Sequence, residues 1–151
     1  MNYLLFSLGF IILHTLMYQL AGVIDYRVTE HLYSGEDRLF GFFRDMGDEK
    51  ENKRVMKTQF LAQIVRGLLM SLVLYPILDS LSELSFTFRF AFLGGLMFVY
   101  TDLASAAPFV NIEGIVYLKG KYVQREAFWK LQMEMVIYST LFGLLASWLL
   151  F

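Results

Sequence analysis

Cysteine is absent from this chain, and only two histidines occur, His14 and His31. The first absence excludes a disulfide-stapled scaffold, and the second leaves a histidine-rich metal site or a paired-histidine haem site with poor support. The sequence contains no glycine-rich phosphate loop, no HExxH motif and no GxSxG motif. A net charge of −1 excludes a basic nucleic-acid binder. We therefore expect no metal, no cofactor and no nucleic-acid partner.

Charge is also missing from long parts of the chain. Of the 151 residues, 57% are apolar, whereas an average soluble domain has about 45–50%. Residues 25–57 alone hold 15 of the 27 acidic and basic side chains. The very apolar stretches that remain exclude a disordered chain and favour a small polytopic membrane protein.

Four of these stretches are long enough to cross a bilayer, whose core requires about 20 helical residues. They are residues 3–24, 59–78, 86–108 and 131–151. The first stretch has no charged side chain, lacks a basic segment before it and is too long for a cleavable signal peptide. The sequence thus predicts an all-α integral membrane protein, residues 1–151 forming one domain folded as a four-transmembrane-helix bundle.

The positive charges indicate the orientation, because lysine and arginine gather in cytoplasmic loops. Seven of them lie in residues 25–57 and four in residues 109–130, and with four spans these segments share one side. The opposite side has Arg89 alone near it. We expect both segments to be cytoplasmic and both termini to lie outside, in a multi-pass protein of the cell (inner) membrane.

The first cytoplasmic segment contains two helix signals. Leu39, Phe40 and Phe43 fall on one side of a helical wheel, which predicts a short amphipathic helix that lies on the membrane or packs on the bundle. Asp48 and Glu51 have the spacing of a capping box and predict the start of a helix that continues into the second span.

The second cytoplasmic segment contains an apolar run at residues 108–118, which is too short to span. Such runs are often re-entrant, interfacial or buried. Glu113 lies in its middle, where a carboxylate needs a hydrogen-bond partner or a cation, or stays protonated.

Two short motifs accompany this segment, IEGIVY at 112–117 and GLLMSLVLYP at 67–76. Over about residues 60–151 the chain resembles an uncharacterised family of small bacterial four-span membrane proteins, which carries an IEG-x-x-Y-like motif after the third span. The resemblance supports the four-span topology and draws attention to Glu113, but it implies no activity.

Charged residues within spans usually face the bundle or a wet cavity, because they are costly in lipid. Arg66 lies roughly 12 Å and Asp102 roughly 9 Å from the cytoplasmic ends of their spans, at 1.5 Å per residue. Glu134 lies about one turn inside the fourth span. Arg66 is therefore expected to pair with Asp102 or Glu134 across helices, although Glu134 also has Lys130 four residues before it.

Two interpretations of these polar groups stay open. One is a polar cavity in the inner half of the membrane that is open to the cytoplasm. The other is a buried ion pair that sets helix register, with the remaining groups hydrogen-bonded in the core. The candidate residues are His14, Tyr18, Gln63, Arg66, Asp102, Glu113 and Glu134.

Small residues recur at four-residue spacing, which lets membrane helices approach closely within one chain or between chains. They are Gly67 and Ser71, Ala91 and Gly95, and Ser139, Gly143 and Ser147. This pattern is compatible with a homo-oligomer or with a place in a larger membrane complex.

The function expected from these features is non-enzymatic: binding, channel-like or transport-like conduction, or complex assembly, with the lipid bilayer as the first partner. The alternative is a membrane enzyme acting on a lipid or isoprenoid. In that case Glu113 or Asp102 would serve as general base or metal ligand, and Arg66 would hold an anionic headgroup.

Overall fold

The structure is a computed structural model that describes residues 2–103, 107, 110, 116–117, 120 and 123–151, with the backbone alone for 101–103. Within these residues every regular element is helical. The elements are α1 (Tyr3–Tyr33), α2 (Glu49–Leu74), the short 3-10 helix η1 (Tyr75–Ile77), α3 (Leu78–Glu83), α4 (Phe86–Leu103) and α6 (Arg125–Leu149). The predicted all-helical fold is confirmed for the described part of the chain.

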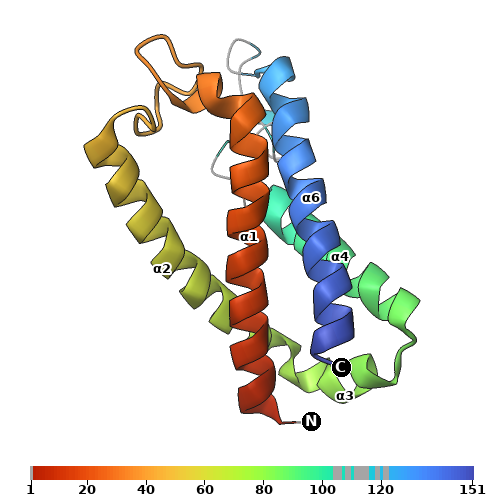
Figure 1. The fold of residues 1–151 in the computed structure, drawn as a ribbon. Coiled ribbons are helices and arrows are strands. Elements are labelled where there is room, and N and C mark those ends of the chain that lie inside the picture. Colours follow the sequence, from red (N-terminus) through yellow and green to blue (C-terminus); the bar gives the residue numbers. More distant parts are fainter. Residues whose placement is uncertain (1, 104–106, 108–109, 111–115, 118–119, 121–122) are drawn as a thin grey trace.

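The four long helices lie in a row rather than in a closed square. Helices α1 and α6 run antiparallel at the centre, α2 packs on α1, and α4 packs on α6 (Figure 1). Both termini lie at the end of the molecule that holds α3 (Figure 1). The connection of residues 34–48 and the first turns of α2 and α6 form the opposite end, which we call the charged end. Helix α2 diverges from α1 toward this charged end.

Helix α1 is longer than the first predicted span. Asn2 caps it, because the side-chain oxygen of Asn2 accepts the backbone N–H groups of Leu4 and Leu5. The helix continues through Asp25 to Tyr33, so residues 25–33 are helical and the prediction that they form a loop is wrong. The predicted span ended at residue 24 because the residues after it are largely polar. A helix that leaves an apolar layer does not have to end there, so the polar residues continue the same helix.

The predicted start of α2 is confirmed. Asp48 is its N-cap, and the carboxylate of Asp48 accepts the backbone N–H of Glu51 at 2.8 Å. Glu51 turns back to accept the backbone N–H of Asp45 at 2.7 Å, rather than that of the capping residue itself. The cap therefore anchors the preceding connection as well as the helix.

The amphipathic helix predicted around Leu39, Phe40 and Phe43 is wrong, because residues 39–42 form turns and none of residues 34–48 is helical. Arg38 fixes them by donating to the backbone oxygens of Gly35 and Phe43. The backbone N–H of Phe40 donates to Leu32 at the end of α1. Phe40 is buried in a small core with Leu32, and Phe43 packs against that core, so the apolar spacing reflects loop packing instead of a helix face.

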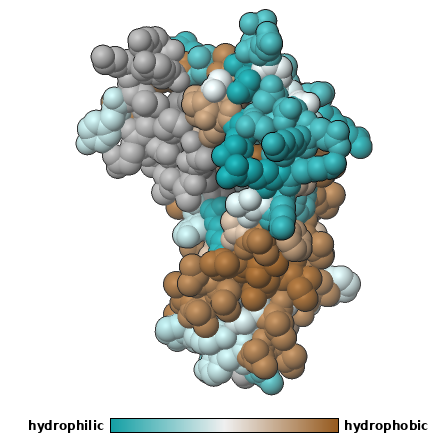
Figure 2. Space-filling view, turned by 90° about the vertical axis from the view of Figure 1, so that its left-hand side faces the viewer, coloured by the Kyte–Doolittle hydropathy of each residue, from teal (hydrophilic) through white to brown (hydrophobic). Residues whose placement is uncertain are grey.

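Two helical runs among the described residues have the length and composition to cross a membrane, Tyr3–Tyr33 and Glu49–Glu83. The apolar part of α4, Phe86–Tyr100, is shorter. Figure 2 shows hydrophobic residues over the lower part of one face and hydrophilic residues toward the charged end. The apolar segment predicted around Glu113 lies outside the described residues.

Glycine permits two close helix contacts. A Cβ at Gly143 of α6 would lie 2.8 Å from the Cα of Gly94 on α4, so the two backbones touch there. A Cβ at Gly67 would lie 3.2 Å from the Cα of Ile11 and from the ring of His14. Of the predicted small-residue stripes, those on α2 and α6 are buried in the chain. Ala91 and Gly95 of α4 are exposed, and Gly94 makes the contact with α6 instead.

Candidate functional site: a cavity at the charged end

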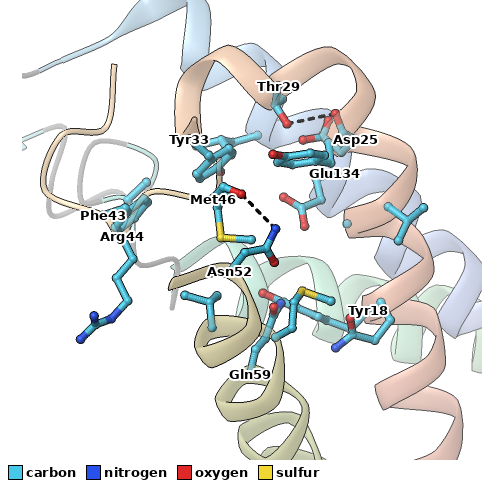
Figure 3. A pocket seen from close by; sticks show the side chains of 18 of the residues that line it. Tyr18, Asp25, Thr29, Tyr33, Phe43, Arg44, Met46, Asn52, Gln59 and Glu134 are labelled. Atoms are coloured by element: carbon cyan, nitrogen blue, oxygen red, sulfur yellow. Dashed lines mark hydrogen bonds between the residues drawn. The ribbon is translucent and has the colours of Figure 1, made fainter. Parts of the chain in front are cut away.

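A cavity of about 730 Å³ opens where α2 diverges from α1 (Figure 3). This volume lies within the range of small-molecule sites, about 300–1,000 Å³. Helices α1, α2 and α6 and the connection of residues 34–48 supply its walls. The lining residues are Tyr18, Gln19, Gly22, Val23, Asp25, Tyr26, Thr29, Tyr33, Phe43, Arg44, Met46, Asn52, Val55, Met56, Gln59, Arg66, Ala107, Leu131, Glu134 and Met135.

One face of α1 forms the first wall. Tyr18, Gly22, Asp25 and Thr29 follow one another at spacings of three and four residues and so share this face. Asp25 is only 2% exposed, and its Oδ1 has no hydrogen-bond partner among the described residues. The hydroxyl of Thr29 donates to the backbone oxygen of Asp25 at 3.0 Å, so Thr29 does not satisfy that carboxylate oxygen (Figure 3).

Helix α6 brings a second carboxylate to the same side. Glu134 faces Gly22, since a Cβ added at Gly22 would lie 3.6 Å from Glu134 Oε1. Figure 3 shows the side chains of Asp25 and Glu134 directed into the same space. Within the described chain neither carboxylate forms an ion pair. Lys130 instead bonds to Glu126 at 2.7 Å, so the pairing of Lys130 with Glu134 that the sequence allowed does not form.

Helix α2 forms the opposite wall with Asn52, Gln59 and Arg66. The guanidinium of Arg66 lies over the ring of Tyr100 on α4, 4.9 Å from the ring centre. Its Nη2 has no hydrogen-bond partner in the described structure. No ion pair joins Arg66 to Glu134 among the described residues, so this one of the two predicted pairings is wrong. The other predicted partner, Asp102, has its side chain outside the described part of the chain.

A hydrogen-bonded junction of three helices lies next to the cavity, toward the termini. His14 Nε2 is 3.0 Å from Gln63 Oε1, and His14 Nδ1 is 2.5 Å from the Tyr138 hydroxyl. A neutral imidazole donates from one nitrogen and accepts at the other. Because an amide oxygen only accepts, Nε2 donates to Gln63 and Nδ1 accepts from Tyr138, whose hydroxyl also lies 3.4 Å from Met97 Sδ. One histidine thereby joins α1, α2 and α6.

The predicted site residues thus divide into three groups. Tyr18, Arg66 and Glu134 line the cavity. His14 and Gln63 belong to the buried junction, which matches the structural interpretation of those residues. The side chains of Asp102 on α4 and of Glu113 lie outside the described part of the chain.

Sequence reasoning missed Asp25, Asn52 and Gln59 as cavity residues. Asp25 lies on the same polar stripe as His14 and Tyr18, but it was assigned to a loop because the first span was ended at residue 24. Asn52 looks like an ordinary residue of a solvated helix start. Gln59 shares a helix face with Gln63 and Arg66 by its spacing, but it was not counted among the cavity residues. Nothing in the sequence signals that α2 diverges from α1, and this divergence is what turns both residues toward a cavity.

Charged groups beyond the cavity hold the charged end together. The backbone N–H groups of Gly47 and Gly35 donate to Asp45, at 2.7 and 3.1 Å, and lower the pKa of its carboxyl. The ammonium of Lys130 donates to Glu126 and lowers the pKa of that carboxyl. Both carboxyl groups are therefore ionised at neutral pH, where these hydrogen bonds are retained.

The fold and the site together define an all-helical protein with a ligand-sized cavity at its charged end. Among the described residues no group of three acidic, histidine or cysteine side chains could hold a metal ion. No family model, curated protein or solved structure matches the chain.

Proposed function

We propose that this chain is an integral membrane protein with four spans in the cell (inner) membrane, with both termini outside and the charged end in the cytoplasm. The positive charges on two segments of one side support this orientation. Large apolar side chains that are exposed on three different helices support the membrane, among them Val73 (76%), Phe88 (69%) and Trp148 (71%). Water-soluble monomers rarely expose contiguous apolar surfaces of large area.

Within that membrane protein the cavity serves as a binding site for a small amphiphilic molecule, without a chemical step. The observation that carries this proposal is a 730 Å³ cavity with three lining residues that each contain a buried polar atom without a partner in the described structure. These atoms are Asp25 Oδ1, Gln19 Nε2 and Arg66 Nη2. Buried polar groups are normally hydrogen-bonded, so such a set points to a bound molecule that completes them.

The apolar part of the lining fits the same conclusion. Val23, Val55, Met56, Leu131 and Met135 surround the polar groups. Small-molecule sites typically combine apolar walls with a few placed polar groups. The enzyme hypothesis depends on the side chains of Glu113 and Asp102, and no described contact favours it over binding.

The test compares two glycine variants of equal chemistry. Gly22→Leu projects into the cavity, where an added Cβ meets only ordinary van der Waals contact. Gly95→Leu is the matched control, because Gly95 is exposed on α4 with no atom within 4 Å of an added Cβ. Native mass measurement of protein purified from membranes should show a retained small molecule in the wild type and in Gly95→Leu. Equal retention by Gly22→Leu would contradict the proposal.

A further inference from the structure

The cavity separates charges of opposite sign onto different walls. Asp25 and Glu134 lie on the side of α1 and α6. Arg66 lies on α2. No ion pair connects these walls in the part of the chain that the structure describes. A molecule that satisfies Asp25 has to donate a hydrogen bond, whereas one that satisfies Arg66 has to accept. A single ligand that meets both conditions and also neutralises the carboxylates and the guanidinium carries a cation and an anion.

The two charges also lie at different depths. Glu134 meets Gly22 on α1, whereas Gly67, the residue after Arg66, meets Ile11 and His14. Gly22 lies eight residues beyond His14 toward the charged end, which is roughly 12 Å along the helix. The long side chain of Arg66 covers part of this distance to reach the cavity. The carboxylates are therefore nearer the charged end and the guanidinium is deeper.

Phospholipid headgroups with an amine have the same order of charges. Their phosphate lies next to the acyl chains, and their ammonium lies at the outer end of a two-carbon linker. Seated with its chains toward the membrane interior, such a headgroup presents its phosphate to the deeper guanidinium and its ammonium to the outer carboxylates. Arginine is well suited to phosphate, which accepts two parallel N–H groups of the guanidinium.

Resting on the proposed binding function, we infer that the cavity binds a zwitterion of the phosphoethanolamine type, supplied by a membrane phospholipid. Arg66 holds its phosphate, and Asp25 with Glu134 accepts the N–H groups of its ammonium. A choline headgroup has the same charges but no N–H group to donate, so it leaves the unpartnered Oδ1 of Asp25 unsatisfied. The site accordingly prefers ethanolamine over choline lipids.

The test titrates delipidated full-length protein with phosphatidylethanolamine, phosphatidylcholine and phosphatidylglycerol of identical chains, with native mass spectrometry as the readout. We expect ethanolamine lipid to bind about tenfold more tightly than choline lipid, the effect of one charge-assisted hydrogen bond. Asp25→Asn should abolish this preference, and Arg66→Gln should weaken all three lipids. The controls Glu30→Gln and Arg27→Gln change exposed residues of α1 and should leave the binding of all three unchanged.

The outcomes separate this inference from the broader proposal. Equal binding of the three lipids that Gly22→Leu abolishes would overturn the headgroup assignment and leave the binding function in place. Lipid binding that Gly22→Leu does not affect would overturn both. Displacement of the lipid by soluble phosphoethanolamine in the wild type, but not in Asp25→Asn, would support the headgroup chemistry and assign it to a free ligand. Far-ultraviolet circular dichroism checks that each variant is folded.

Discussion

The junction around His14 offers the sharpest test of how this fold is held together. Replacing His14 by phenylalanine removes both of its hydrogen bonds and leaves the amide of Gln63 and the hydroxyl of Tyr138 without that partner. An unpaired buried group costs about 1–3 kcal/mol in soluble proteins, whereas interhelical hydrogen bonds in membranes average about 0.6 kcal/mol. We therefore expect His14→Phe to lower the free energy of unfolding by about 1–3 kcal/mol.

A double-mutant cycle of His14 and Tyr138 measures the coupling energy between the two side chains. Tyr138→Phe removes one hydroxyl and should cost about 0.5–1.5 kcal/mol. The double variant should be no less stable than His14→Phe alone, because the hydroxyl that has lost His14, and keeps only the weak acceptor Met97 Sδ, is then absent. Tyr117→Phe, at a position 79% exposed, is the matched control and should change stability by less than about 0.5 kcal/mol.

The assay is equilibrium unfolding in mixed micelles, followed by far-ultraviolet circular dichroism. Contacting residues that share a hydrogen bond show coupling energies of about 0.5 kcal/mol or more. Losses that add within about 0.3 kcal/mol would refute the junction, because independent sites behave that way. A neutral Tyr138→Phe would refute it as well.

Four further predictions concern packing, capping, pH and topology. Gly143→Ala should destabilise by about 1–3 kcal/mol because it forces α4 and α6 apart, whereas Gly95→Ala should be neutral or slightly stabilising in the same unfolding assay; equal effects would be inconsistent with the close contact. Asp48→Ala should cost about 1 kcal/mol through the lost cap of α2, seen as an earlier thermal unfolding transition, and an unchanged transition would count against that cap. The pKa of Asp45 is lowered in the folded chain. The stabilising contribution of Asp45 is therefore complete above its unfolded pKa of about 3.9 and disappears as the pH falls through the folded value. In thermal melts between about pH 6 and pH 2, Asp45→Asn should lose less stability on acidification than the wild type, and a pH profile that matches the wild type would disprove this role. A reporter fused to the C-terminus should read outside the cytoplasm, and a cytoplasmic signal would reject the orientation.

The sequence predicted the helical architecture better than the helix ends. Apolar length predicted the helices, and the Asp48–Glu51 pair predicted the start of α2, because capping depends on neighbours within one turn. The end of α1 was missed by nine residues, since polar residues from Asp25 onward remain compatible with a helix that packs on other elements. The turn segment around Phe40 was missed because its apolar spacing fits a helix face as well as a packed loop.

For the candidate site, too, the sequence predicted where residues lie along a helix but not which residues meet across helices. Tyr18, Arg66 and Glu134 were predicted to lie at similar depths, because depth follows from helix rise and span boundaries, and all three line the cavity. Of the two expected pairings of Arg66, the one with Glu134 does not form, and Arg66 lies over Tyr100 instead. The pairing with Asp102 stays a prediction. Pairing depends on the rotation and tilt of each helix, which a one-dimensional pattern does not contain.

The sequence by itself determined an all-helical chain with long apolar helices, charges gathered at one end and polar groups at known heights along each helix. Those properties depend on composition and on the 1.5 Å rise, both of which are local. Only the tertiary structure decided that α2 diverges from α1, that Gly94 rather than Gly95 meets Gly143, and that Asp25 and Arg66 face a shared cavity without pairing. These features result from side chains of distant segments packing together, so they exist only once the helices have met.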